Sequence, residues 1–280
     1  MRNKSALVTF IYPEAKKYLP QLFESINNQT FKEFDFVVFS DGVLDREVDW
    51  KNINHYLISQ KGTPIEIRIE SIRVLKALSY ENLVFVDADD TMSNNRIEKS
   101  IKLLENYCFV CNDLNRINQA GILIESEIWK DRLSTNFEFD SDFILNKNIL
   151  GLGNSSIRKE ILNIEIKSPD QSIVAGDWYI FYSFLKLARE KAIFTSDCST
   201  NYRQHLNNVI GSKEFSKDRL KAILNAKKTH YEALAHADFN EVKCELEKVN
   251  VSLARNLNYI SLNELPRNPF WWEEDNYLNI

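Results

Sequence analysis

The sequence predicts an α/β protein with a mostly parallel, Rossmann-like sheet flanked by helices and followed by a C-terminal helical extension. Three observations predict this class. Apolar runs rich in β-branched residues alternate along the chain with segments of helical periodicity, as in strand–helix–strand units. Residues 83–86 are apolar without interruption, as in a strand buried on both faces of a parallel sheet. Beyond Gly211 the composition shifts to two amphipathic helical patterns.

The N-terminal part of the chain contains the clearest elements. Residues 6–12 predict a buried strand that Pro13 ends. A helix follows, with Pro20 in its first turn and apolar residues at spacings of three and four. The next elements predicted are strands over 34–39 and 65–69, a helix over 72–78, and the central strand over 83–86.

The rest of the chain gives weaker patterns. Asn94 or Asn95 is expected to cap a helix whose apolar face includes Ile97 and Ile101. Further strands are predicted over 107–111 and 120–125, and residues 131–148 show no regular pattern. A loop of small residues is predicted over 151–156, before a helix that begins near Arg158. An apolar helix is predicted over 178–187. The shift near Gly211 predicts a domain over 1–212 and a helical extension over 213–280.

Composition and charge limit the function classes. The 280 residues are 44% hydrophobic and 27% charged, which is ordinary for a globular protein. A net charge of −5 offers no case for nucleic acid as a partner. Cys108 and Cys111 form one Cys-x-x-Cys, but no second pair follows, so free thiols in a reducing compartment are expected rather than a metal or redox site. No apolar window is long enough to span a bilayer and the N-terminus does not resemble a signal peptide, so a cytoplasmic protein is expected.

Three carboxylates follow the central strand directly. Asp87, Asp89 and Asp90 are expected at its carboxyl end, where open α/β sheets bind their ligands. Acids so close together repel one another unless a cation lies among them. Mg²⁺ or Mn²⁺ would suit them, because both ions favour carboxylate ligands and share their coordination sphere with phosphates. The alternative is that these residues only cap the next helix and its loop.

Four separated stretches together resemble the family 2 glycosyltransferases, which are inverting enzymes of the GT-A fold. They cover roughly residues 5 to 212 and are the strand and helix over 8–30, the strand end over 36–42, the Asp87-Ala88-Asp89-Asp90 segment, and Gly176-Asp177-Trp178-Tyr179 followed by 202–211. The last pair resembles a rhamnosyltransferase-like branch. The chain departs from the family pattern at three places. After the first strand it has Ile11-Tyr12-Pro13-Glu14 where the family has Pro-Thr-Tyr-Asn, and after the second strand Ser40 stands in place of the first acid of an Asp-Asp pair. The Ala-Arg-Asn that the family carries before the metal strand is not present, and Ser71-Ile72-Arg73 lies nearest to its position.

The resemblance implies a role for each matching residue. Asp177 would be the general base, and Mn²⁺ or Mg²⁺ would be held by Asp87, Asp89 and His205. The nucleotide-sugar would contact Thr9, Tyr12, Glu14, Asp41, Arg73, Asp87, Ala88, Arg203 and His205. The acceptor would lie near Asn154, Ser155 and Trp178. For Asp177, a purely structural role as a helix N-cap is the alternative.

The function expected from the resemblance is transfer of a sugar to a hydroxyl of a glycan or lipid-linked glycan, in surface polysaccharide synthesis. The donor would be dTDP-rhamnose-like, with a UDP-hexose as the second choice. Two other functions stay open, a GT-A scaffold without activity that serves as an assembly partner, and a nucleotidyltransferase.

The C-terminal extension is the least informative region. Its lysine-rich start is explained better by a solvated helix face than by a peripheral contact with the inner face of a membrane. The aromatic pair Trp271 and Trp272 either packs back on the first domain or mediates a homodimer, and nothing in the sequence decides between these two roles.

Overall fold

The computed structural model describes residues 3–204, 216–255, 261–262 and 266–279. Its strands are β1 (Ser5–Ile11), β2 (Phe34–Asp41), β3 (His55–Gln60), β4 (Asn82–Phe85), β5 (Thr91–Met92), β6 (Phe109–Ile117), β7 (Leu123–Glu125), β8 (Phe137–Phe139), β9 (Ser155–Arg158), β10 (Ala192–Arg203), β11 (Ser261–Leu262) and β12 (Leu278–Asn279). Its α-helices are α1 (Leu19–Asn27), α2 (Pro64–Ala77), α3 (Arg96–Leu104), α4 (Gly176–Ala188), α5 (Lys217–His236) and α6 (Lys243–Ala254).

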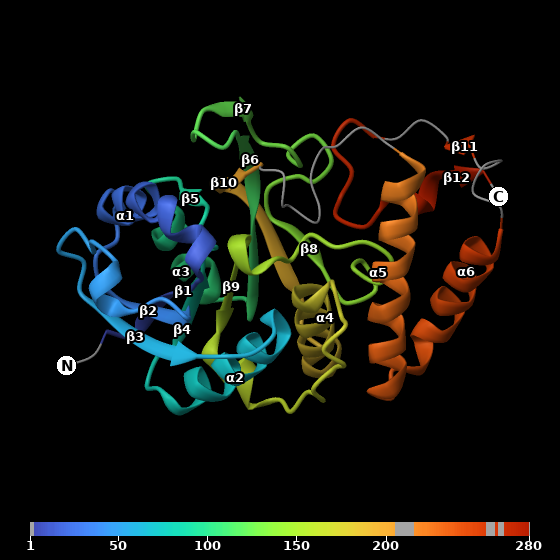
Figure 1. Ribbon diagram of the computed structural model, residues 1–280, viewed down its shortest axis with the longest axis horizontal. Helices are drawn as coiled ribbons and strands as arrows, with labels where there is room; N and C mark the ends of the chain where they lie inside the picture. Colours follow the sequence, from blue (N-terminus) through green and yellow to red (C-terminus); the bar gives the residue numbers. More distant parts are fainter. Residues whose placement is uncertain (1–2, 205–215, 256–260, 263–265, 280) are drawn as a thin grey trace.

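A single large sheet runs through the molecule in the order β3-β2-β1-β4-β9-β6-β10-β5, with β3 and α6 at opposite ends (Figure 1). β1 pairs in parallel with β2 and β4, and β2 pairs in parallel with β3. β9 lies antiparallel between β4 and β6, so β6 and its parallel partner β10 point the same way as β4. The predicted α/β class with a mostly parallel sheet is therefore confirmed.

Alternating side chains of the strands fill two cores, one on each face of the sheet. In β1, Leu7 and Ile11 pack with α1 and α3, whereas Ala6 and Val8 belong to the core under α2 and α4. This period of two is what a strand buried on both faces requires. The predicted buried strands β1, β2 and β4 are confirmed, and so is the amphipathic helix α1.

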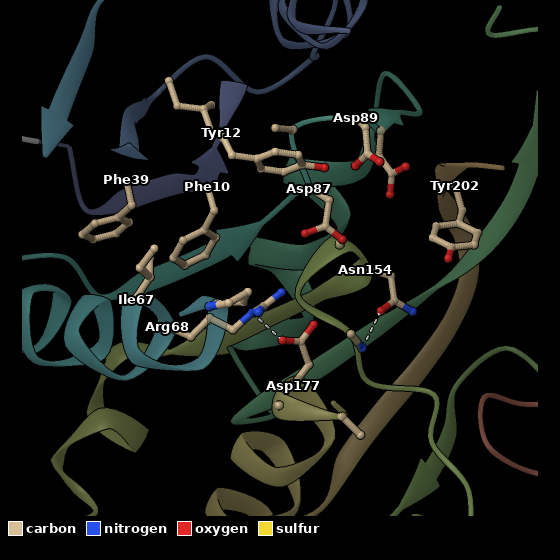
Figure 2. Close-up of a pocket in the computed structure, with 18 of the residues that line it drawn as sticks. Phe10, Tyr12, Phe39, Ile67, Arg68, Asp87, Asp89, Asn154, Asp177 and Tyr202 are labelled. Carbon is tan, nitrogen blue, oxygen red and sulfur yellow. Dashed lines mark hydrogen bonds and ion pairs between the residues drawn. The ribbon is translucent and has the colours of Figure 1, made fainter. Parts of the chain in front are cut away.

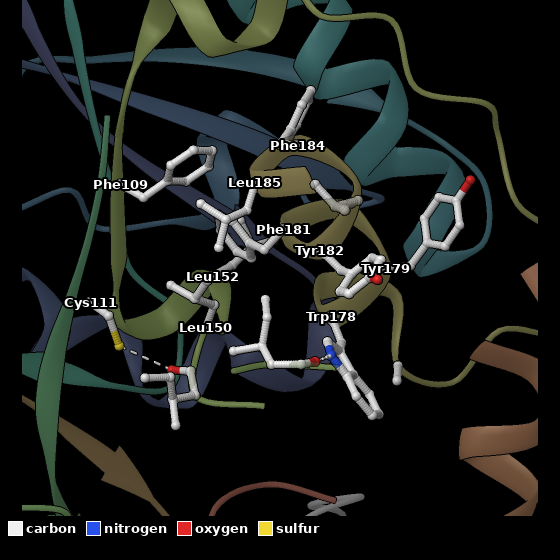
Figure 3. Close-up of a cluster of buried hydrophobic side chains, with 14 of the residues drawn as sticks. Phe109, Cys111, Leu150, Leu152, Trp178, Tyr179, Phe181, Tyr182, Phe184 and Leu185 are labelled. Carbon is white, nitrogen blue, oxygen red and sulfur yellow. Dashed lines mark hydrogen bonds between the residues drawn. The ribbon is translucent and has the colours of Figure 1, made fainter. Parts of the chain in front are cut away.

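Helix α4 is apolar around nearly its whole circumference because it lies between the sheet and α5 (Figure 3). Trp178 is buried, and its indole Nε1 donates a hydrogen bond to the carbonyl oxygen of Ile144 at 2.7 Å. Leu224, Tyr231 and Leu234 of α5 join the same core. The two predicted C-terminal helices therefore form, and they share their apolar packing with the sheet.

The prediction of a strand over residues 65–69 was wrong, since these residues begin helix α2. Thr63 caps the helix, its side-chain oxygen accepting from the Glu66 amide, while the Glu66 carboxylate accepts from the Thr63 amide at 2.7 Å. Isoleucine at every second position from 65 to 69 gives the period of two that is typical of a strand, because this helix is buried on two sides. Ile65 and Ile69 face the core, whereas Ile67 faces a cavity.

A loop was expected over residues 151–156 and a helix near Arg158, and this was wrong for residues 155–158. They form β9, which hydrogen-bonds to β4 and β6 on its two sides. Its short, serine-containing sequence carries little local strand signal, so the pairing with two neighbours decides its structure. Strands β3 and β10 were not predicted, and β10 forms the parallel partner of β6.

Two further expectations concern chemistry and location. All four cysteines are free thiols in the structure, as expected, with Cys111 buried in β6. Within the described ranges, no helix is long and apolar enough to cross a membrane.

We expect Thr63→Ala to lower the free energy of unfolding by about 1 kcal/mol, because it removes the side-chain oxygen that caps α2. Urea denaturation followed by circular dichroism measures the change. Thr63→Ser is the matched control, since it keeps the hydroxyl group. If both variants are equally destabilised, the cap is not the reason.

Candidate active site

A cavity of about 770 Å³ opens at the carboxyl ends of β1, β2 and β4. Phe10, Phe39 and Ile67 form an apolar end, and Tyr202 lies at the opposite end, as Figure 2 shows. Asp87 and Asp177 face each other between these two ends. The cavity therefore combines a non-polar compartment with a cluster of carboxylates, as binding sites for small polar ligands commonly do.

Asp87 and Asp89 follow β4 and line the cavity. Burial, the nearby Asp89 carboxylate and then Asp177 raise the pKa of Asp87 from its usual 3.8 to about 7. Asp90 is buried, and one of its oxygens accepts a hydrogen bond from the Arg203 amide at 2.8 Å. Burial and its two acidic neighbours raise its pKa well above the usual range. The carboxylates at this site therefore repel one another, and a bound cation would reduce that repulsion.

Asp177 projects from the first turn of α4 toward these acids. Its Oδ1 lies 2.7 Å from Arg68 Nε in an ion pair (Figure 2). Its Oδ2 accepts a hydrogen bond from the Leu152 amide at 3.2 Å. The N-cap of α4 is Ala175, and no side chain caps the helix. The alternative role of Asp177 as an N-cap is therefore not observed.

Arg68 is a site residue that sequence reasoning missed, and Arg73 was named in its place. Arg73 is exposed and pairs with Glu70 of its own helix at 2.8 Å, away from the cavity. Five residues along a helix correspond to a turn of about 140° around its axis, so only one of the two arginines can face the cavity. Recognising the capping box at Thr63 as the start of a helix would have pointed to Arg68.

Five predicted contacts of the nucleotide-sugar do line the cavity: Tyr12, Glu14, Asp41, Asp87 and Ala88. Tyr12 is 36% exposed and lies close to the acids, as Figure 2 shows. Its burial, followed by Asp89 and Asp87, raises the pKa of its hydroxyl, which stays protonated and can donate a hydrogen bond.

Thr9 and Ser155 lie elsewhere. Thr9 is fully buried in β1 and does not line the cavity. Ser155 is fully buried in β9, opposite Cys111, and does not line the cavity either.

Arg203 was expected to face a diphosphate, but its guanidinium is buried against main-chain oxygens. Nε donates to the Asp89 carbonyl at 2.6 Å, one terminal nitrogen donates to the Asn118 and Gln119 carbonyls, and the other donates to Gln21 Oε1. These bonds hold the turn that carries the acids. Arg203 is therefore a positioning residue.

Asn154 and Trp178, expected near the acceptor, line the cavity, yet their polar atoms already have partners. Asn154 Oδ1 accepts from the Gly151 amide at 2.9 Å, and its Nδ2 donates to the carbonyl oxygens of Asn112 and Ile149. The Trp178 ring stacks on His230, with centroids 3.8 Å apart. Both residues shape the wall of the cavity.

The expected metal ligands are only partly brought together. His205 lies outside the described residues. Among the described residues, no group of three or more His, Cys, Asp or Glu side chains is arranged to hold a metal ion. Two carboxylates, Asp87 and Asp89, nevertheless fit an ion such as Mg²⁺, which is often bound by one or two carboxylates together with phosphate oxygens of a ligand.

No protein-family model matches the chain. An uncharacterized glycosyltransferase of Methanocaldococcus jannaschii is 33% identical over 111 residues, which is 36% of this chain and 37% of that protein. An uncharacterized glycosyltransferase of Rickettsia bellii is 28% identical over 134 residues, 44% of this chain and 19% of that protein. A probable polyketide synthase 9/36 of Dictyostelium discoideum is 27% identical over 184 residues, 64% of this chain and 6% of that protein. The chain thus spans 37% or less of each relative.

Solved structures are similar to this chain over most of its length. Residues 1–349 of S. aureus TarS in complex with UDP-GlcNAc align with 90% of this chain and 74% of that one, with a TM-score of 0.59 and 18% identity. GalNAc-T7 with UDP, GalNAc and Mn²⁺ aligns with 89% of this chain and 54% of that one, with a TM-score of 0.54 and 13% identity. The chain therefore has the GT-A fold, as its sequence predicted.

We expect Asp87→Asn to raise the free energy of unfolding by roughly 4 kcal/mol at pH 8, and by progressively less as the pH falls towards 4. The folded protein keeps the Asp87 proton up to about pH 7, whereas the unfolded chain loses it near 3.8. Stability is therefore lost as the pH rises through this window. Denaturation at several pH values without added metal measures the effect.

Asp131→Asn, at an exposed carboxylate outside the cavity, is the control. A gain for Asp87→Asn that does not change with pH would contradict the raised pKa of Asp87.

Proposed function

We propose that this chain is a metal-dependent glycosyltransferase that moves a sugar from a nucleoside-diphosphate donor to a hydroxyl of a glycan acceptor. One observation carries the proposal: the carboxylates of Asp87 and Asp89 lie at the end of β4, and the carboxylate of Asp177 faces them across one cavity. The GT-A fold and the two relatives described as glycosyltransferases support it.

The apolar end of the cavity suits the nucleoside of the donor. Phe10 and Phe39 stack there, with ring centroids 5.4 Å apart, and Asp41 at the end of β2 offers a carboxylate to a ribose or base. We infer that UDP is the nucleotide, because the two solved structures of this fold were obtained with UDP-GlcNAc and with UDP. The sequence motifs favour dTDP-rhamnose, which makes dTDP the second choice.

Asp87 and Asp89 would hold Mn²⁺ or Mg²⁺, with His205 as a further predicted ligand. When bound, such an ion neutralises the charge that develops on the leaving diphosphate. GalNAc-T7 was solved with Mn²⁺, which supports this proposal. The raised pKa of Asp87 implies that ion binding also drives its deprotonation near neutral pH.

Asp177 is then the general base. The acceptor oxygen attacks the anomeric carbon while the bond from that carbon to the diphosphate breaks, and the electron pair of that bond leaves with the diphosphate. The hydroxyl proton passes to Asp177, whose carboxylate lies on the other side of the cavity from Asp87. Direct attack from that side inverts the anomeric centre.

Arg68 has two roles in this mechanism. Its ion pair fixes the position of the Asp177 carboxylate before substrates bind. Its side chain is 28% exposed and lines the cavity, so the guanidinium can also contact a phosphate oxygen.

The same ion pair favours a second candidate, a scaffold without activity. If Arg68 keeps Asp177 paired when ligands are present, the carboxylate cannot accept the acceptor proton. Measurements of nucleotide binding and of transfer separate the two functions.

We expect UDP with Mn²⁺ to raise the thermal unfolding midpoint of the protein. A ligand at about a hundredfold over its dissociation constant adds about 2.7 kcal/mol of stability. EDTA and Asp89→Ala should each abolish the shift, whereas Arg73→Ala, on the same helix as Arg68 but away from the cavity, should retain it. A differential scanning fluorimetry screen of UDP, dTDP and GDP measures this.

A shift that persists in EDTA would contradict metal dependence. The absence of a shift with every nucleotide would favour the scaffold.

We expect Asp177→Asn to lower the rate of UDP release from UDP-GlcNAc, with methyl glycosides as acceptors, by roughly 10²- to 10⁴-fold, the usual contribution of a general base. The thermal shift with UDP and Mn²⁺ should not change, because Asp177 is not proposed to hold the ion. Asp142→Asn, at an exposed acid paired with Lys186 of α4, is the control. A full rate in Asp177→Asn would disprove the assigned base.

A further inference from the structure

The C-terminal segment returns to the cavity, although its sequence lies far from the other lining residues. Trp271 and Asn148 exchange two main-chain hydrogen bonds, of 2.7 and 3.0 Å, and form an isolated antiparallel bridge. The bridge brings Trp271 and Trp272 into the cavity lining. Trp272 is buried, whereas Trp271 is only partly buried.

Three consecutive acids fasten this segment to two parts of the molecule, the loop that carries Arg132 and helix α5. Glu273 forms a two-point ion pair with Arg132 at 2.6 and 2.9 Å. Glu274 pairs with Arg219, and Asp275 pairs with Lys227. The Lys227 side chain is only 1% exposed, so its pairing with Asp275 is obligatory.

The backbone at this point is strained. Trp272 has a φ of 63°, a left-handed conformation that a bulky residue rarely adopts. Such strain persists only where the surroundings enforce it, and it concentrates at binding sites. The three ion pairs and the strain together hold the ring of Trp271 in one position.

The short loop over residues 151–153 connects the Trp271 ring with the proposed catalytic groups. A Cβ atom at Gly151 would lie 2.9 Å from the Trp271 ring, and one at Gly153 would lie 2.6 Å from the Asp87 carboxylate. Between them, the Leu152 amide donates its hydrogen bond to Asp177. Residues 151–153 therefore touch the aromatic ring, the base and the metal-site acid in succession.

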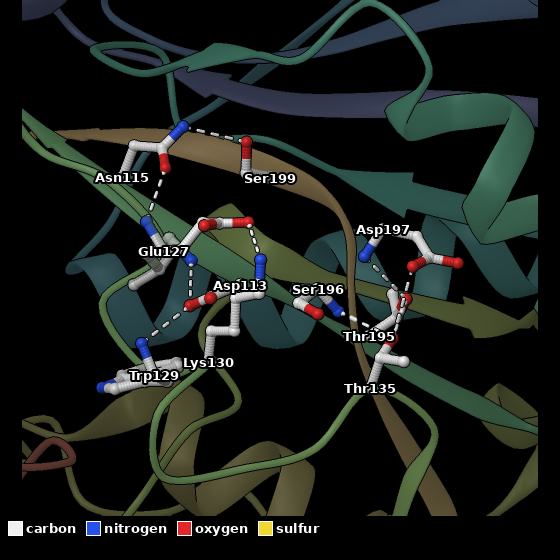
Figure 4. Close-up of polar contacts among 11 residues, drawn as sticks. Asp113, Asn115, Glu127, Trp129, Lys130, Thr135, Thr195, Ser196, Asp197 and Ser199 are labelled. Carbon is white, nitrogen blue, oxygen red and sulfur yellow. Dashed lines mark hydrogen bonds and ion pairs between the residues drawn. The ribbon is translucent and has the colours of Figure 1, made fainter.

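Two other aromatic residues, Trp129 and Tyr202, pack against the Trp271 ring. The fully buried Trp129 meets it edge to face, with centroids 5.1 Å apart, and Tyr202 lies 6.2 Å away. Trp129 is held in turn by its amide, which donates to the buried Asp113 carboxylate at 3.0 Å, as Figure 4 shows. Trp129 is fully buried, whereas Trp271 keeps part of its surface exposed and lines the cavity.

A sugar ring is the ligand that this surface fits. The acceptor hydroxyl must lie beside Asp177, and the ring that carries it must lie against the neighbouring wall. A pyranose presents a patch of C–H groups on one face, and a tryptophan ring offers a flat apolar surface of similar size. The nucleoside is assigned to the opposite, apolar end of the cavity, which leaves Trp271 for the acceptor.

We propose that Trp271, fastened by Glu273, Glu274 and Asp275, is the stacking platform for a pyranose ring of the acceptor. The inference rests on the proposed function, because it takes Asp177 as the base that the ring must approach. The three acids and their cations are positioning residues.

Saturation-transfer NMR tests the platform, with methyl glycosides of glucose, N-acetylglucosamine, galactose and rhamnose as probes and with the full chain, UDP and Mn²⁺. Irradiation of aromatic protons should transfer saturation to the ring C–H protons of at least one glycoside. Trp271→Ala should weaken its binding roughly tenfold, the size expected for loss of one aromatic stacking partner. Trp50→Ala is the matched control, because Trp50 stacks on His55 and Phe23 outside the cavity.

Trp271→Phe and Trp271→Leu separate a loss of stacking from a loss of folding, since both keep an apolar side chain at the bridge between Trp271 and Asn148. Retained binding in Trp271→Phe and lost binding in Trp271→Leu would support stacking on a flat ring. Unchanged glycoside binding in Trp271→Ala, or no saturation transfer to any glycoside in the unmodified protein, would overturn the inference.

The thermal shift with UDP and Mn²⁺ separates this inference from the proposed function. A shift of normal size in Trp271→Ala, together with weaker glycoside binding, would support the platform. Loss of the UDP shift in Trp271→Ala would overturn the platform and assign the ring to the nucleoside. If none of the nucleotides in the screen bound the unmodified protein, the proposed function itself would fail.

Discussion

The repulsion among the carboxylates at the end of β4 is the constraint on which the rest of the structure depends. Asp87, Asp89 and Asp90 share one turn, and burial further disfavours the charges of Asp87 and Asp90. Two buried arginines compensate from behind. Arg96 of α3 donates to the Phe85 carbonyl and to Asn112, and Arg203 of β10 holds the carbonyl of Asp89 and the carboxylate of Asp90. The turn is thereby fixed, and Asp87 and Asp89 face the cavity.

Strand β9 explains how the opposite wall reaches these acids. Because it is inserted antiparallel between β4 and β6, it begins at the end of the sheet where β4 finishes, and the loop before it lies over the acids. Gly151 and Gly153 permit contacts that any side chain would prevent. One loop can therefore set the positions of Asp87, Asp177 and Trp271 relative to one another.

The C-terminal segment contributes to the same cavity. Helix α5 packs on α4, whose first turn carries Asp177, and α5 also supplies Arg219 and Lys227 to the acids that follow Trp272. A cation–carboxylate pair with one member almost fully buried is costly to break, because the partner would be left as an uncompensated charge. The helices thus provide both packing for the sheet and a fixed wall for the cavity.

The sequence by itself determined the elements whose signals are local. Uninterrupted apolar runs defined β1, β2 and β4, and the residue order placed the acids at a strand end and Asp177 at a helix start. Only the tertiary structure decided what depends on partners distant in the chain. It paired Arg68 of α2 with Asp177 of α4 in the cavity, and it paired β9 with two strands. It also bound Arg203 to main-chain carbonyls and set Trp271 against Gly151, because hydrogen bonds and close contacts between distant residues leave no periodic pattern in the sequence.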